Sequence, residues 1–366
     1  MKNRWIGWLC LCSFLCLGIF SLEGLIVFSG CSSKSEPKRP TYTEKREACK
    51  EFHPYRKAYF GDLHIHTSFS FDAYAYETRI VPKDAYAFAK GKSIAIPPLG
   101  KDGKGTRTLK LERKLDFAAV TDHSEFFGEI GICTTPGSPG YKSDFCENYR
   151  KNGEGSVVSM GVRLAFDEPE RESTVCGKGN ATCKEYALKR WQAIQKAAED
   201  AYDRTPACSF VSFHGYEYTA TQGVSNRHRN VIFRNAAVPK LPVSFYEAPQ
   251  PHLLWQGLKK QCMDAGNGCE VVTIPHNFNL SNGNIYFPIY PDTKTPKEEK
   301  AQAALRGQVE SVMEMFQHKG DMECHSGLKN ILGFADPYCN FEKAYLKIED
   351  QCKDDETGGG GMRLGG

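Results

Sequence analysis

The stretch that decides the fold is residues 59–74, YFGDLHIHTSFSFDAY. A short apolar run there ends in His64 and His66, and Asp72 follows. Residues i and i+2 of a β-strand point to the same face, so both imidazoles can bind one cation at the strand end. Histidine and carboxylate ligands without thiolate suit zinc, manganese or iron, and an open coordination position in such a site allows hydrolysis. The alternative interpretation is a polar strand end carrying two ordinary histidines.

Other apolar runs end in the same types of polar residue. They are 117–120 with Asp122 and His123, 210–213 with Glu217, 271–274 with His276, and 312–316 with His318. Helical patterns alternate with these strands at 81–90, 185–203, 252–263 and 296–306. Such alternation, with functional residues after the strands, predicts an α/β barrel with its site at the C-terminal ends of parallel strands. His228 lies at the start of a strand expected around 231–233, so the rule that functional residues follow the strands does not explain its position.

The composition is that of a globular protein. The chain has 366 residues, of which 40% are hydrophobic and 25% charged, and its net charge is +3. This balance provides no electrostatic case for a nucleic-acid partner. The apolar content suffices for one large domain or two small ones, of which we expect one over residues 59–366, with residues 31–58 as a tether and lead-in.

The N-terminus carries an export signal. Lys2 and Arg4 precede the apolar run 5–28, and Ser29 and Gly30 precede Cys31. Small residues before a cysteine resemble a bacterial lipobox, although Phe28 stands where that pattern prefers leucine. Residues 1–30 are therefore interpreted as a lipoprotein signal peptide, with Cys31 lipidated in a membrane of the cell envelope. A plain signal peptide and an uncleaved signal anchor are the alternatives, and all three export the domain.

Cysteine usage agrees with export. Eleven cysteines follow Cys31, which is typical of an oxidising compartment. Close spacing favours the pairs Cys176 with Cys183 and Cys262 with Cys269, and less strongly Cys133 with Cys146 and Cys339 with Cys352. Residues 128–179 are rich in Gly, Pro, Ser and Cys with little periodicity, so we expect a disulfide-stapled insertion at the mouth of the fold.

Taken together, these motifs resemble the PHP (polymerase and histidinol phosphatase) superfamily of metal-dependent hydrolases. The segments FGDLHIHTSFSFDAY, GYEYTA, NRHRNVIF, IPHN and FQHKG are most similar to the DUF3604 family of exported PHP-like proteins, some of which act as arylsulfatases. The resemblance implies a distorted (β/α)7 barrel. It also implies a cluster of two or three divalent ions, Mn, Zn or Fe.

The resemblance also assigns ligands. His64 and His66 would hold a first ion, Glu217 would bridge it to a second ion on His228 and His276, and Asp72 and His123 would hold a third. Asp122 would orient an imidazole or cap the strand end. The superfamily's final Asp-x-His motif is not found after Cys339. We therefore expect a C-terminally truncated member whose barrel lacks its last strand or strands.

The resulting functional hypothesis is hydrolysis of sulfate or phosphate monoesters, by resemblance aryl sulfates, with a metal-activated water. Glu217 and His228 would act as ligands in catalysis. Arg227 and Arg229 could bind the anionic ester group, or they could form a solvated charged edge. The alternative is a catalytically incomplete, lipid-anchored metal-binding protein. A polymerase-associated nuclease is disfavoured because export removes the chain from the replisome.

Overall fold

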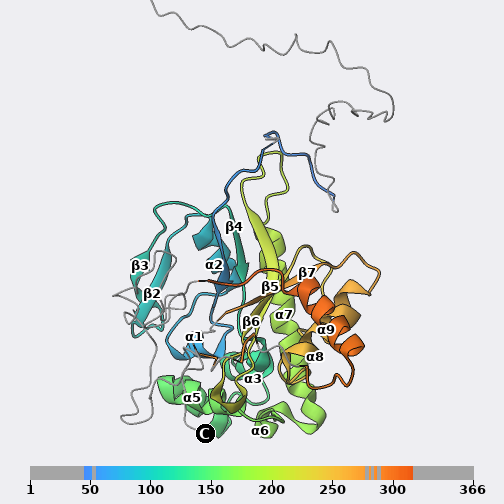
Figure 1. Ribbon diagram of the computed structural model, residues 1–366. Coiled ribbons are helices and arrows are strands. Elements are labelled where there is room, and N and C mark those ends of the chain that lie inside the picture. The colour runs from blue at the N-terminus through green and yellow to red at the C-terminus, as the bar shows by residue number, and fades with distance from the viewer. Residues whose placement is uncertain (1–44, 52–54, 277–279, 282–283, 287–289, 316–366) are drawn as a thin grey trace, which may run out of the picture. The chain divides into compact units, whose positions relative to one another are not determined.

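The central element of the fold is a five-stranded sheet in the order β1-β4-β5-β6-β7 (Figure 1). The computed structural model describes residues 45–51, 55–276, 280–281, 284–286 and 290–315. The strands are β1 (Gly61–Ile65), β4 (Phe117–Val120), β5 (Val211–Tyr218), β6 (Arg229–Phe233) and β7 (Val271–Pro275). The architecture is mixed α/β with a curled, half-barrel sheet, which confirms the α/β class.

The direction of the strands decides which ends meet. β1, β4 and β5 run parallel, whereas β6 is antiparallel to both β5 and β7. The C-terminal ends of β1, β4, β5 and β7 therefore share one edge with the start of β6. The expectation that every strand runs parallel is wrong for β6, and this reversal explains why His228 precedes its strand.

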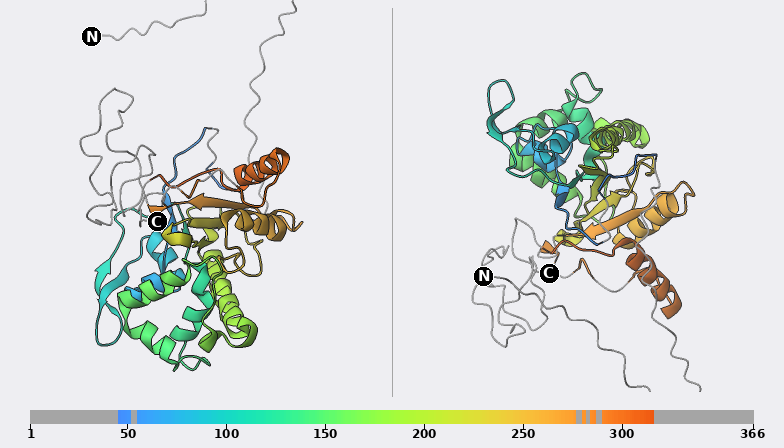
Figure 2. Two further views of the ribbon diagram at one scale, coloured as in Figure 1. Left: turned by 60° about the horizontal axis from the view of Figure 1, so that its bottom comes forward. Right: turned by 90° about the horizontal axis from the view of Figure 1, so that it is seen from above.

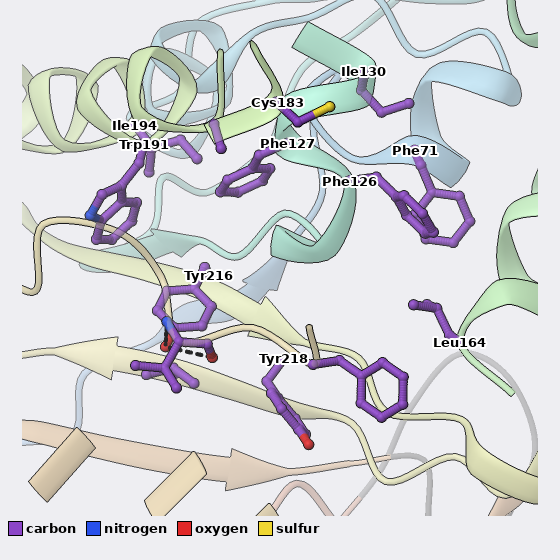
Figure 3. Packing of buried hydrophobic residues seen from close by; sticks show 14 of the residues in the cluster. Phe71, Phe126, Phe127, Ile130, Leu164, Cys183, Trp191, Ile194, Tyr216 and Tyr218 are labelled. Carbon is purple, nitrogen blue, oxygen red and sulfur yellow. Dashed lines mark hydrogen bonds between the residues drawn. The ribbon is translucent and has the colours of Figure 1, made fainter. Parts of the chain in front are cut away.

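Helices cover one face of the sheet. They include α2 (Pro82–Ala89), α3 (Phe127–Thr134) and α7 (Ala181–Ala201). Figure 3 shows Trp191 of α7 and Phe127 of α3 across from Tyr216 and Tyr218 of β5, all in the largest buried apolar cluster. The opposite face carries a thin apolar layer, in which Ala119, Ile232 and Ile274 are buried.

Two helices pack together near β7. They are α8 (Pro251–Leu258), which continues as a π-helical turn over Lys259–Met263, and α9 (Pro296–Val309). Figure 2 shows them beside each other at this end of the sheet. α9 begins with Pro296 after a capping box, in which Thr295 and Glu298 satisfy each other's backbone N–H groups.

Residues 128–179 are more regular than expected. They contain α4 (Asp144–Lys151), α5 (Gly153–Arg163) and α6 (Ser173–Cys176) as well as most of α3. These helices were not predicted, because the segment is rich in glycine and serine and shows little periodicity. Tyr149 of α4 donates a hydrogen bond to the carbonyl of Phe71 at the start of α1 (Phe71–Ala75), so this region packs against the segment that carries Asp72. Residues 94–109 form a separate hairpin of β2 (Ile94–Leu99) and β3 (Gly105–Leu109).

Four disulfides lie within the described residues. Cys133–Cys146, Cys176–Cys183 and Cys262–Cys269 confirm the pairs expected from spacing. The fourth, Cys49–Cys208, joins residues 159 positions apart and was not predicted. Such disulfides are typical of an oxidising, extracytoplasmic compartment. Cys31, Cys339 and Cys352 lie outside the described residues.

The strand expected at 312–316 is not confirmed, because residues 312–315 have no regular secondary structure. Within the described residues, no helix has the length and apolar character needed to cross a membrane.

Candidate metal centre

Glu217 lies at the centre of a cluster of imidazoles. Its side chain is buried at the end of β5. Five imidazoles contact it: Oε2 lies 3.1 Å from Nε2 of His66 and 3.4 Å from Nε2 of His64, and Oε1 lies 2.9 Å from Nδ1 of His228 and 3.1 Å from Nε2 of His276. Nδ1 of His123 is 3.3 Å from Oε1. Both oxygen atoms of the Glu217 carboxylate therefore face imidazole nitrogen atoms.

The electrostatics favour an ionised Glu217. Burial alone would raise its pKa, but the imidazoles of His123 and His276 hold the pKa well below the ordinary 4.5. Neither carboxylate oxygen accepts a hydrogen bond from the described residues, and both ring nitrogens of His276 are likewise buried without one. Buried polar atoms are normally satisfied, so these atoms fit a set of metal ligands.

Hydroxyl groups orient three of the imidazoles. Ser70 Oγ lies 2.9 Å from Nδ1 of His66, which leaves Nε2 directed at Glu217. Thr221 Oγ1 lies 3.1 Å from Nε2 of His228, which leaves Nδ1 directed at Glu217. Thr219 Oγ1 contacts Nδ1 of His123, which leaves Nε2 directed at Asp72. Outer contacts of this kind fix the orientation of metal-binding histidines.

Asp72 lies on the other side of His123. Its Oδ2 is 3.4 Å from Nε2 of His123. Burial would raise the pKa of Asp72, but the charge of His123 holds it far below the ordinary value. Burial lowers the pKa of His123, yet Glu217 and Asp72 raise it to about 9. In the metal-free protein these two carboxylates therefore keep a proton on His123.

Glu314 completes the cluster and was not predicted. Its Oε2 is 2.8 Å from Nδ1 of His64, and its backbone N–H donates to the carbonyl of Pro275. Burial lowers the pKa of His64, but the neighbouring carboxylates of Glu217 and Glu314 raise it to about 9. The sequence signal for Glu314 was weak, because this residue follows α9 in a segment without regular structure.

The ligand atoms form groups that one ion can span. Each group has its donor atoms within 4.8 Å of one another: His64, His66 and Glu217; Glu217, His228 and His276; His66, Asp72 and His123; and His64, His276 and Glu314. All seven ligands expected from the sequence thus come together. A further group of Glu129, Cys176 and Cys183 is unsuitable because its cysteines form a disulfide.

The cluster opens into a cavity of about 730 Å³. Its lining includes five of the expected ligands: His64, His66, Asp72, His123 and Glu217. It also includes Tyr76, Val312 and Met313. All three are exposed apolar or aromatic side chains, so the cavity combines candidate metal ligands with a surface suited to an apolar group.

Asp122 joins β1 to β4 beside the cluster. Its carboxylate accepts hydrogen bonds from the backbone N–H and the hydroxyl of Thr67. No imidazole donates to it among the described residues. Asp122 is fully buried, and this burial raises its pKa to about 6. The structure therefore favours the strand-end cap over the imidazole orienter.

Other polar residues near these sequence motifs lie elsewhere. Arg227 and Arg229 line a separate cavity, so the structure does not bring them into the cluster. His214 and Tyr216 point to the helix-covered face, where Tyr216 packs on Trp191 and His214 lies beside Glu199. Asn277 and His318 fall outside the described residues.

Comparison with known proteins identifies a family. The model of the family described as "Protein of unknown function (DUF3604)" matches residues 53–360. No curated protein and no solved structure matches the chain.

Proposed function

Since the chain belongs to the DUF3604 family, whose description states no activity, we propose from the site that it is a metal-dependent hydrolase of sulfate or phosphate monoesters. The observation that carries this proposal is Glu217, a buried carboxylate without hydrogen bonds that faces five imidazoles. A site of this composition suits two or three ions of Mn, Zn or Fe.

Different side chains of the cluster would hold different ions. His64 and His66 would hold one ion and His228 and His276 a second, and Glu217 belongs to both of these ligand groups. Asp72 and His123 would hold a third. Ions bound there would supply an activated water and neutralise the charge of the ester oxygens. Ser70, Thr219 and Thr221 keep the imidazoles oriented, so the ligands need little rearrangement when ions bind.

The cavity supports an aryl ester. Tyr76, Val312 and Met313 add exposed apolar surface to the cavity that the candidate ligands line. A phenyl ring placed against them would keep its sulfate or phosphate group in the same cavity as these ligands. Aryl sulfates are therefore the first substrate class to test.

Two further parts of the proposal concern the rest of the chain. The half-barrel sheet belongs to a distorted (β/α)7 barrel of PHP type, which the ligand-bearing edge supports. Residues 1–31 export the protein and anchor it by lipid on Cys31, which the disulfides support.

The test combines metal analysis with turnover. Purified protein should contain divalent metal and should hydrolyse p-nitrophenyl sulfate or p-nitrophenyl phosphate, with activity lost to a chelator and restored by Mn²⁺ or Zn²⁺. Bound metal without turnover of either ester would favour a metal-binding protein instead. Protein that binds no metal would contradict both.

A further inference from the structure

A second cavity lies on the helix-covered face of the sheet. Its volume is about 290 Å³, and it shares no lining residue with the metal cavity. Alternation along β6 explains the separation, because Asn230 lines the metal cavity whereas its neighbour Arg229 lines the second one. The start of β6 therefore serves two cavities on opposite faces.

Three arginines line this cavity: Arg227, Arg229 and Arg306. Among the described residues, one buried carboxylate pairs with two of them. Glu310 lies 2.8 Å from Nε of Arg229 and 3.1 Å from Nη2 of Arg306. At the rim, Asp292 is exposed and bonds to His252. The cavity therefore has an excess of positive charge.

Arg227 is the uncompensated cation. Its Nη1 donates to Gln250, at 2.8 Å, and to Gln222, at 3.3 Å, both neutral amides. Its Nε is buried and has no hydrogen-bond partner within the described residues. No carboxylate of these residues forms an ion pair with it. A guanidinium with free donors, held rigidly by two amides, suits bidentate recognition of an oxyanion.

Apolar and aromatic side chains form the remaining walls. Trp255 and Tyr290 meet edge to face with their ring centroids 6.2 Å apart, and Pro251 and Ile285 lie beside them. A cavity of this size and composition matches a single flat ring with a charged substituent.

We propose that this cavity binds a small organic oxyanion, with an aromatic or flat apolar body against Trp255 and a carboxylate, sulfate or phosphate group on Arg227. The site is distinct from the metal centre and does not depend on the proposed hydrolase activity.

Benzenesulfonate is the probe, because it carries an oxyanion on a ring and has no ester to hydrolyse. Binding is measured by calorimetry and by the fluorescence of Trp255, on metal-loaded and on chelator-treated protein. We expect one saturable site on the chelator-treated protein, and the metal-loaded protein should retain this site beside any binding at the metal centre. Inorganic sulfate should bind more weakly, and neutral benzyl alcohol more weakly still.

Variants locate the site. Arg227→Gln should weaken benzenesulfonate binding by about ten-fold or more, the usual cost of losing a charge-assisted hydrogen bond. Arg234→Gln is the matched control, because Arg234 is exposed just after β6 and should leave binding unchanged. Arg306→Gln is a second variant, and we expect it to weaken benzenesulfonate binding too. Absence of saturable binding, equal binding by Arg227→Gln and Arg234→Gln, or binding seen only with metal would overturn the proposal.

Discussion

Oε2 of Glu314 lies 2.8 Å from Nδ1 of His64, although 250 positions separate the two residues in the chain. With His276 they form a group of donor atoms that could bind an ion at the outer side of the cluster. The segment after α9 thereby contributes a carboxylate to a site otherwise built from the sheet and α1.

Replacing Glu314 tests this contribution. Glu314→Gln keeps the shape but removes the charge that faces His64, so we expect metal affinity to fall by about 10- to 100-fold. Glu299→Gln on the exposed surface of α9 is the control. The measurement is metal content after dialysis, by mass spectrometry. Equal content in the two variants would show that Glu314 is not a ligand.

Glu217→Gln should have a larger effect, because one change removes the charge shared by two ligand groups. We expect loss of bound metal and a fall of more than about 100-fold in kcat/KM for the ester that the protein hydrolyses. Glu185→Gln, at an exposed position on α7, is the control. Thermal unfolding of both variants separates a chemical effect from misfolding, and full activity in Glu217→Gln contradicts the bridging role.

Metal binding should release protons. In the metal-free protein the pKa of His64 and of His123 is raised to about 9, against the burial that lowers it, by neighbouring carboxylates. Both imidazoles are therefore protonated at pH 7, and an ion must displace those protons. Metal affinity should rise with pH up to about 9. Calorimetry in buffers of different ionisation enthalpy measures the released protons, and a heat independent of the buffer would contradict this prediction.

Asp122 should make stability depend on pH. Burial raises its folded-state pKa from 3.8 to about 6, so the folded protein binds a proton that the unfolded chain has released. This contribution is present below about pH 4 and is lost as pH rises through 6. Asp122→Asn does not ionise, so its stability relative to wild type should increase by about 3 kcal/mol between pH 4 and 7. Urea unfolding of both metal-free proteins checks this, and a pH-independent difference contradicts it.

The long-range disulfide should contribute most to stability. In the chain-entropy model, Cys49–Cys208 contributes about 5 kcal/mol because it closes a loop with a sequence separation of 159. Cys262–Cys269, with a separation of 7, contributes about 2 kcal/mol. Replacing each pair by serine and comparing free energies of unfolding tests this order. A larger loss for the short loop would show that strain or denatured-state structure dominates.

Local patterns predicted most of the metal site. His64 and His66 share a strand end because side chains alternate, and the short apolar runs before Asp122 and Glu217 are strands in the structure. The position of His228 could not be predicted from local patterns, because it depends on the direction of β6. That direction is set by the pairing of β6 with β5 and β7. The close cysteine pairs were visible from spacing, whereas Cys49–Cys208 was not.

Three features depended on tertiary structure alone. Glu314 reaches His64 through the path of the chain after α9, which carries no periodic pattern. Arg227 and Arg229 flank His228 in sequence, yet they line a separate cavity, whereas His228 contacts Glu217 in the cluster. The helices in residues 128–179 form despite a composition rich in glycine and serine, because tertiary packing outweighs weak propensity.

The reversed direction of β6 also bears on the order in which the protein folds. β5, β6 and β7 form a contiguous antiparallel meander, and it alone carries Glu217, His228 and His276. Such sequence-local pairing closes with less loss of chain entropy than the parallel pairing that brings in His64, His66 and His123. One half of the metal centre can therefore assemble early and offer an ion three ligands before β1 and β4 dock. Pulse-labelled hydrogen exchange would then show β6 protected before β4.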